Sequence, residues 1–260
     1  KDCDPYLRFV FLTGITKFSQ LSIFSELNNI SNISMKDDYA GICGITETEL
    51  LDDMQDGIAG MAQANELTPQ QVVAKLKENY DGYHFSAHSP GVFNPFSLLS
   101  SLANKDFDSY WFASGTPTYL VNMLQRFNVQ PASLQRMCAK SSAFDSPTET
   151  MKTITPLLYQ SGYITIKGYD KISQLYTLDL PNKEVKVGLF ESLLPNYLDG
   201  TYAEQGDVTI ARMSVLIRQN DIDGALRLLQ TFLATVPYCN VTNHEGHYQQ
   251  MLFIIFSLLT

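Results

Sequence analysis

Apolar residues recur at helical spacing over most of the chain and alternate at strand spacing in a few short stretches. Residues 8–13 begin with Arg8, continue with four apolar residues and end at Thr13, which predicts a buried strand closed by Gly14. A second short strand is predicted at residues 33–35. Helices are expected to dominate the rest, so the pattern predicts an α+β fold that is predominantly helical.

Capping signals mark the predicted helix starts between residues 46 and 117. Residues 46–49 (Thr-Glu-Thr-Glu) and 68–71 (Thr-Pro-Gln-Gln) have the form of capping boxes, and residues 94–95 and 116–117 place a proline directly after a cap. The expected inner faces of the first two helices are Leu50, Leu51, Met54 and Ile58, followed by Val72, Val73, Leu76 and Tyr80.

The periodicity changes after residue 150. A short helix from Thr155 to Gly162, a strand at 163–166, a turn at 168–173, a strand at 175–180 and a helix through Tyr197 are expected. This order of helix, hairpin and helix predicts a winged-helix module. Beyond a break at 200–206, helices are expected near 208–219 and 221–235.

The two ends and the composition limit the class of protein. Hydrophobic residues make up 45% of the 260 residues and charged residues 17%, which is ordinary for a globular protein in solution. The chain starts at Lys1 rather than a methionine, and an apolar run at 248–259 stops at the last residue, so both ends are expected to be cut. That run is shorter than the ~20 residues that span a bilayer, so no membrane contact is expected.

Charge and cysteine usage limit the partners and the compartment. The net charge of −9 argues against a large nucleic-acid surface. The four cysteines are far apart and form no C-x-x-C pair, which predicts reduced thiols, a cytoplasmic location and neither a disulfide frame nor a zinc site.

Three motifs carry a resemblance to a known family. They are Y-D-G-Y-H-F at 80–85, N-P-F-S-L-L at 94–99 and F-V-F-L-T-G-I-T-K-F-S at 9–19. Together they closely resemble the bacterial AAA-ATPase-like family, whose members usually carry a PD-(D/E)XK nuclease-like domain. The resemblance implies the end of a P-loop ATPase core at 1–45, a helical lid at 46–145, a winged-helix module at 146–200 and a helical tail at 201–260 that leads into the nuclease-like domain.

The same resemblance implies a nucleotide site. Thr13 would sense the γ-phosphate from the end of its strand, with Lys17 just beyond it; alternatively, Thr13 only caps the next segment. Gly82 would allow a left-handed turn, and Tyr83 would either stack on a purine or fill the core. His84 is a lone histidine and is assigned no metal.

The segment Ser-Gly-Thr-Pro at 114–117 resembles the G-x-P turn of P-loop ATPase lids. Gly115 and Pro117 would then pack near the adenine; the alternative is a helix start with proline in its first turn.

Several features of ATP turnover are missing from the sequence. It contains no G-x-x-x-x-G-K-[ST] loop, no strand ending in paired acids for Mg²⁺ and no arginine between residues 9 and 125. ATP and Mg²⁺ are therefore expected in the intact protein only, and this piece alone is expected to be inactive.

The C-terminal segment offers a second candidate site. Residues 245–249 and the apolar run after them resemble the first helix of the nuclease-like domain, in which a helical acid at the position of Glu245 would help to hold Mg²⁺. The alternative is a solvated glutamate at a helix start. His244 and His247 have zinc-compatible spacing, but no further ligands accompany them.

The expected hairpin carries charges that raise the question of DNA binding. Lys167, Lys171, Lys183 and Lys186 lie on or near it, and Asp170, Asp179 and Glu184 nearly balance them, so packing within the protein is favoured over phosphate contacts.

The expected function is a nucleotide-responsive regulatory module coupled to a nuclease-like domain, and the alternative is a non-enzymatic scaffold that binds protein or DNA. The expected partners are a nucleotide, DNA through the nuclease-like domain, and a second copy through the terminal helix.

Overall fold

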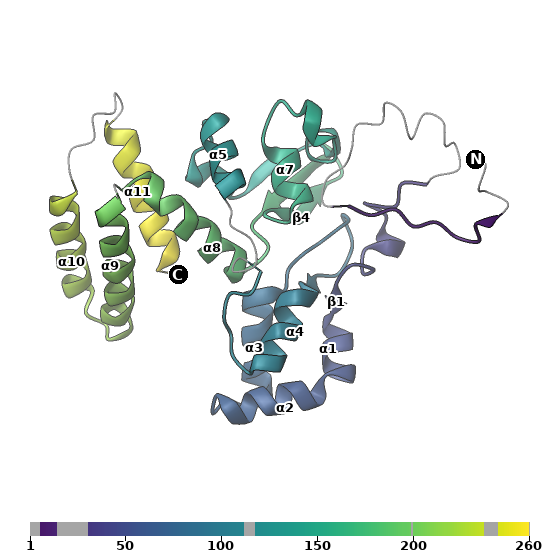
Figure 1. The fold of residues 1–260 in the computed structure, drawn as a ribbon, viewed down its shortest axis with the longest axis horizontal. Helices are drawn as coiled ribbons and strands as arrows, with labels where there is room; N and C mark the ends of the chain where they lie inside the picture. The colour runs from purple at the N-terminus through teal and green to yellow at the C-terminus, as the bar shows by residue number, and fades with distance from the viewer. Residues whose placement is uncertain (1–5, 15–30, 112–117, 199, 237–243, 260) are drawn as a thin grey trace. The chain divides into compact units, whose positions relative to one another are not determined.

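A computed structural model describes residues 6–14, 31–111, 118–198, 200–236 and 244–259 (Figure 1). The fold is mixed α+β and predominantly helical, as the hydrophobic pattern predicts. The chain forms two compact units, and each draws on two separate stretches of sequence. Unit 1 comprises Lys1–Asp108 and Arg136–Asn182, and unit 2 comprises Ser109–Gln135 and Lys183–Thr260.

Four helices build the first stretch of unit 1. They are α1 (Glu47–Asp53), α2 (Gln55–Ala64), α3 (Pro69–Tyr80) and α4 (Pro95–Asn104), preceded by the 3-10 turn η2 (Asp37–Tyr39). Both predicted capping boxes are present: the Thr46 side chain accepts from the Glu49 backbone, and the Thr68 side chain accepts from the Gln71 backbone. The core of this part is made of fully buried side chains from all four helices, including Leu50, Met61, Val72, Leu76 and Leu98.

The apolar stripe from residue 50 to residue 58 does not lie on a single helix. Met54 has φ −122° and ψ 25°, which ends α1 and starts α2. Because the axis changes there, Leu50 and Ile58 are buried while Leu51 remains 42% exposed.

A three-stranded antiparallel sheet forms the second stretch of unit 1. Its order is β3-β5-β4, with β3 (Met137–Ala139), β4 (Thr165–Asp170) and β5 (Leu175–Asp179). The short helices α6 (Ser141–Phe144) and α7 (Thr155–Gln160) accompany it, with the turn η4 (Thr148–Thr150) between them. Phe144 is fully buried and makes edge-to-face ring contacts with Tyr159 and Tyr176.

The predicted order of helix, two-stranded hairpin and helix over 151–198 is confirmed by α7, β4, β5 and α8 (Lys183–Leu193). The details differ in two ways. The first strand starts at Thr165 and runs to Asp170, because the pairing shifts between Ile166 and Gly168 and lets the strand continue into the predicted turn at 168–173. The strand β3 was not predicted.

The expected strands at 8–13 and 33–35 are wrong. Residues 7–14 are described outside any helix or strand, and Phe9 and Leu12 are 81% and 59% exposed. A strand needs a neighbour for its backbone groups, and no described residue pairs with this segment. Near Ile33, the Lys36 amide donates to the Ile33 carbonyl, which makes a turn.

The secondary structure elements of unit 2 are all helices within the described residues. It contains α5 (Thr118–Arg126), η3 (Pro131–Leu134), α8, η5 (Leu194–Asn196), α9 (Gly200–Arg218), α10 (Ile222–Thr235) and α11 (His244–Leu258). The helices α9 and α10 are joined by a short turn and pack side by side (Figure 1).

The break expected at 200–206 is wrong, because those residues form the start of α9. A Cβ on Gly206 would lie 2.9 Å from Leu198 Cδ1 and 3.6 Å from Phe232 Cζ. This glycine therefore allows close helix packing instead of ending a helix.

The terminal helix is largely covered by the chain itself. Met251, Ile254 and Ile255 in α11 are fully buried, and Phe253 makes an edge-to-face contact with Phe190 of α8. The apolar run at 248–259 predicts a helix that residues beyond Thr260 or a second molecule would have to cover. That prediction is wrong for Ile254, which the chain itself buries, whereas Phe256 is 47% exposed. Among the described residues, no helix has the length and apolar character to cross a membrane.

Candidate functional site

The loop at residues 80–85 follows α3 and carries the Y-D-G-Y-H-F motif. Helix α3 ends at Tyr80, whose side chain is 1% exposed and whose hydroxyl donates to the Asp108 carbonyl at 2.7 Å. Asp81 leaves the helix in extended conformation, and its Oδ1 accepts the Gly82 amide at 2.6 Å. This short contact directs the chain away from the helix axis.

Gly82 occupies a position that excludes other residues. Its φ is +97°, in the region that L side chains rarely adopt. A Cβ at this position would collide with the Pro181 carbonyl oxygen and would lie 2.9 Å from Lys167 Nζ. The backbone of the loop therefore approaches the end of β5 and the middle of β4 very closely.

Lys167 fixes that approach. Its ammonium donates to the carbonyl oxygens of Gly82 and Pro181, each at 2.8 Å. Partial burial lowers the pKa of Lys167, and the carboxylates of Asp179 and Asp81 act in the opposite direction. The charge of this lysine is therefore used within unit 1 and is not free for phosphate contacts.

Thr165 makes a second connection between the loop and β4. The His84 amide donates to Thr165 Oγ1 at 2.8 Å, and Thr165 Oγ1 donates to the His84 carbonyl at 2.9 Å. Thr165 is 3% exposed, so this pair of hydrogen bonds lies away from water. One threonine thus satisfies both backbone groups of a loop residue.

Tyr83 is a core residue in this structure. It is 8% exposed, and its backbone pairs with Val92 in both directions at 2.9 and 3.2 Å. Val92 belongs to β2 (Val92–Phe93), which pairs with β1 (Ile45–Thr46). Tyr83 of the motif therefore extends the small antiparallel ladder formed by β1 and β2.

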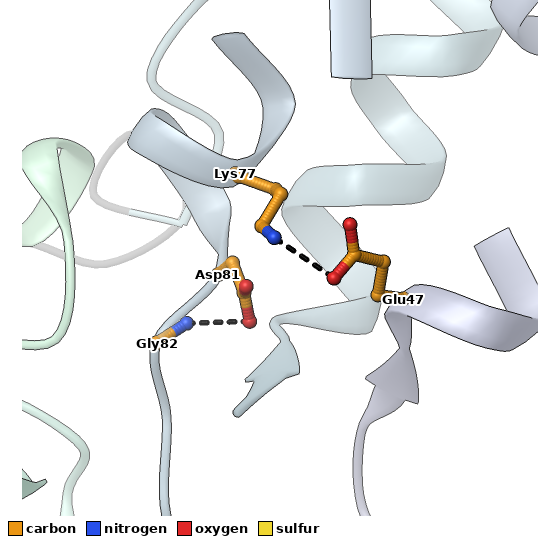
Figure 2. Close-up of polar contacts among 4 residues, drawn as sticks. All are labelled: Glu47, Lys77, Asp81 and Gly82. Atoms are coloured by element: carbon orange, nitrogen blue, oxygen red, sulfur yellow. Dashed lines mark hydrogen bonds and ion pairs between the residues drawn. The ribbon is translucent and has the colours of Figure 1, made fainter. Parts of the chain in front are cut away.

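An ion pair lies beside the loop. Figure 2 shows Lys77 of α3 reaching toward Glu47 of α1, with Nζ to Oε2 at 2.8 Å, while Asp81 faces the Gly82 amide. The hydrogen bond to Glu47 raises the pKa of Lys77, and the nearby charges of Glu47 and Asp81 add to it. Both members of the pair are about half exposed, so the pair orients the two helices more than it stabilises them.

The far side of the loop brings an imidazole and a carboxylate together. A Cβ on Gly91 would lie 3.2 Å from Asp81 Oδ1 and 3.4 Å from His84 Nε2, so both groups converge over this glycine. His84 Nδ1 pairs with the Ser89 carbonyl at 2.9 Å, which fixes the ring. Ser86 nearby is 1% exposed, and its hydroxyl has no partner within the described residues.

The predicted site residues are only partly brought together. Gly82 and Tyr83 lie in this loop, and Thr13 lies exposed in the irregular segment 6–14, where no described hydrogen bond joins it to the loop. Lys17, Gly115 and Pro117 lie outside the described residues. Glu245 lies in the first turn of α11, and its side chain is outside the description. The predicted convergence of Thr13, Gly82 and the 115–117 turn on one cleft stays a prediction.

Sequence reasoning missed the residues that hold the loop, namely Lys167, Thr165 and Pro181. For Lys167 the sequence favours packing within the protein over DNA contact, but it does not predict the contact with the 80–85 loop. The sequence contains only a weak signal. Lys167 stands between Ile166 and Gly168 in β4, and nothing in this pattern indicates a contact with Gly82, 85 positions earlier.

Histidine and metal chemistry can be assessed for part of the chain. His247 Nε2 pairs with the Tyr197 carbonyl at 3.0 Å, so that nitrogen is occupied within unit 2. Within the described ranges, no group of three or more His, Cys, Asp or Glu side chains could hold a metal ion.

The chain is similar to one curated protein of undefined role. It is 31% identical over 266 aligned residues to an uncharacterised protein in the vnfD 5′ region of Azotobacter chroococcum mcd 1. The alignment covers all of this chain and 49% of that protein, so the chain spans about half the length of the curated relative that it matches. No known family's sequence profile and no solved structure matches the chain. The AAA-ATPase-like resemblance therefore stays a prediction.

Proposed function

We propose that this chain is a regulatory module, the helical lid and winged-helix portion of an ATPase-like protein. The proposal is supported by the motifs at 9–19, 80–85 and 94–99 and by the order α7, β4, β5, α8. In the intact protein, ATP and Mg²⁺ would bind at a site of which this chain supplies a part. A C-terminal nuclease-like domain would receive the signal.

The observation that carries the proposal is the connection between the 80–85 loop and β4. Three hydrogen bonds join this loop to the first strand of the β4–β5 hairpin: Lys167 donates to the Gly82 carbonyl, and Thr165 and the backbone of His84 exchange two. Because Gly82 also abuts the Pro181 carbonyl, a movement of α3 has to displace the hairpin with it. The loop is therefore suited to pass a change in the lid to the hairpin.

Gly82 and Tyr83 do not fit direct contact with a nucleotide. The face of Gly82 is filled by Pro181 and Lys167, and Tyr83 is buried against β2. We therefore propose that this loop transmits movement between α3 and the β4–β5 hairpin and does not itself contact the nucleotide.

The test compares Lys167→Met with Lys171→Met in the full-length protein. Lys171 lies exposed in the turn of the same hairpin and makes no described polar contact, so its variant has the same charge change. Hydrogen exchange of residues 165–179 is measured with ATP, with ADP and without nucleotide. We expect a nucleotide-dependent change in the wild type and in Lys171→Met, and its loss in Lys167→Met with ATP affinity unchanged within about twofold.

Two results would contradict the proposal. One is a full-length protein that binds no ATP, which would favour the non-enzymatic scaffold. The other is an unchanged exchange response in Lys167→Met. The isolated 260-residue chain is expected to bind ATP weakly or not at all, and calorimetry that finds micromolar affinity would contradict that expectation.

The nuclease-like part of the proposal rests on the resemblance at Glu245. Full-length protein with Glu245→Ala is expected to lose Mg²⁺-dependent nicking of plasmid DNA, whereas Gln249→Ala, on the exposed side of the same helix, is expected to retain it. Nicking that is unaffected by Glu245→Ala removes this residue from the site.

A further inference from the structure

A groove runs between α9 and α10 on the surface of unit 2. It has a volume of about 500 Å³ and is lined by Arg212, Val215, Leu216, Gly224, Arg227, Leu228 and Thr231. The α9 residues are spaced i, i+3, i+4, and the α10 residues are spaced i, i+3, i+4, i+7. Each helix therefore contributes one stripe to the groove.

The floor of the groove is apolar and accessible. Val215 is 45% exposed, and Leu216 and Leu228 are half-buried. Buried residues such as Met213 and Leu229 lie on other sides of α9 and α10. The apolar residues of the groove are therefore not part of the core that these two helices form. Aliphatic side chains from another molecule would remove this apolar surface from water, which favours binding.

The edges of the groove carry two guanidinium groups, Arg212 from α9 and Arg227 from α10. Both are exposed, and neither has a hydrogen bond or an ion pair within the described part of the chain. They are two of 18 lysine and arginine residues in a chain whose net charge is −9. Guanidinium groups form their strongest contacts with carboxylates, often through two parallel hydrogen bonds.

From this combination we propose that the α9–α10 groove binds an acidic peptide segment of a partner protein. Aliphatic side chains of the segment lie on Val215, Leu216 and Leu228, and carboxylates on either side pair with Arg212 and Arg227. Nucleic acid fits less well, because its phosphate backbone binds to a row of several cations. Among the described residues that line it, this groove has only Arg212 and Arg227, separated by an apolar floor.

The probe is a fluorescein-labelled 14-residue peptide with two adjacent leucines between glutamate pairs, compared with a scrambled peptide of the same composition. Binding to the 260-residue chain is followed by fluorescence polarisation. We expect saturable binding that weakens with salt, and weaker binding of the scrambled peptide. Arg212→Glu and Arg227→Glu are each expected to weaken binding about tenfold.

Two matched controls separate the groove from general charge effects. Arg218→Glu makes the same charge change at the end of α9, outside the groove, and is expected to stay within about twofold of the wild type. Val215→Asp is expected to abolish binding, whereas Val208→Asp, at another exposed position of α9, is expected to leave it intact. Both valines are exposed, so neither variant should unfold the chain.

Four results overturn the proposal. They are no binding at millimolar peptide, equal affinity for the scrambled peptide, equal losses in Arg218→Glu and Arg212→Glu, and a single-stranded oligonucleotide that competes more strongly than unlabelled peptide.

Discussion

Lys167 Nζ lies 2.8 Å from the carbonyl oxygen of Gly82, although 85 positions of sequence separate the two residues. The lysine belongs to strand β4, and the glycine belongs to the loop that follows helix α3. Their contact connects the two stretches of chain that make up unit 1. It also explains why the motif at 80–85 contains glycine at this place, since any larger residue would displace the lysine.

Gly82→Ala is expected to destabilise unit 1 by about 2 kcal/mol or more. The positive φ is strained for alanine, and the added Cβ collides with the Pro181 carbonyl. Gly60→Ala in α2 is the matched control. Its Cβ would meet only the flexible Lys105 side chain at 3.5 Å. We therefore expect Gly60→Ala to raise the free energy of unfolding by about 0.5–1 kcal/mol, because alanine has the higher helix propensity. Urea unfolding followed by circular dichroism measures both, and equal effects would contradict the prediction.

Thr46→Ala is expected to cost about 1 kcal/mol, because it removes the side-chain acceptor at the N-terminus of α1. Thr48 lies exposed two residues later within the helix, where alanine is at least as favourable, so Thr48→Ala should be neutral or slightly stabilising. Hydrogen exchange of the Glu49 amide reports on the cap directly. A slow amide in Thr46→Ala would show that the cap is not needed.

The same cap should make α1 sensitive to acid. Hydrogen bonds from the backbone and side chain of Thr46 lower the pKa of Glu49. A lowered folded-state pKa means that the stabilisation is fully present above the unfolded pKa of 4.5 and is lost as the pH falls through the folded value. Glu49→Gln is therefore expected to flatten the pH dependence of α1 exchange below pH 4.5. A profile identical to that of the wild type would contradict this assignment.

Gln250→Leu is expected to destabilise unit 2 by about 1–3 kcal/mol. Gln250 is 6% exposed, accepts from the Ala132 amide at 3.2 Å and donates to Gln130 Oε1 at 3.1 Å. Leucine would fill the space but leave the Ala132 N–H without its acceptor. Gln249 is exposed on the same helix, so Gln249→Leu should change the free energy of unfolding by less than about 0.5 kcal/mol.

Glu184→Ala is expected to cost about 2 kcal/mol, and Glu184→Gln less. One oxygen of this buried carboxylate accepts the amides of Tyr110 and Trp111 at 2.7 and 2.8 Å, and a glutamine oxygen can still do so. Unfolding in urea with tryptophan fluorescence as the probe measures the difference.

Glu191→Gln on the same helix is the control for Glu184. Burial raises the pKa of Glu191, and the charge of Asp207 raises it further. Folding therefore disfavours its ionised form, and removing the charge at pH 7 should be neutral or stabilising. A loss comparable to that of Glu184→Ala would contradict the prediction.

Features that depend on neighbouring residues could be predicted from the sequence. The two capping boxes, the proline after Asn94 and the order of α7, β4, β5 and α8 all follow from short patterns. The strand at 8–13 could not be judged in this way, because an apolar run becomes a strand only when a neighbour pairs with it. The break predicted at 200–206 was wrong for a similar reason. Gly206 lies inside α9 because Leu198 and Phe232 pack closely against it, and local sequence does not show that contact.

The candidate site was harder to predict than the fold. The motif at 80–85 indicated where the loop lies, and its glycine indicated the turn. Thr165 and Lys167, which bind the loop, lie in β4. The sequence pattern of a strand predicts which residues lie on each face of the sheet, but not which distant loop they contact. Lys167 lies at the shift in strand pairing between Ile166 and Gly168. Such a shift cannot be read from the alternation of apolar and polar side chains along the strand.

The interleaving of the two units has a consequence for biosynthesis. The chain passes from one unit to the other after Asp108, after Gln135 and after Asn182. On the ribosome, Ser109–Gln135 emerge long before Lys183–Thr260. The buried Leu120 and Leu124 of α5 therefore have to wait in the nascent chain for the later stretch of unit 2, in which Asn196 accepts a hydrogen bond from Gln125 of α5. Meanwhile unit 1 cannot close its sheet until β5 has been translated. Unit 1 is therefore complete once Asn182 has been translated, whereas unit 2 has to wait for α11. We expect chaperones that recognise apolar segments to bind the α5 segment until α11 has left the exit tunnel.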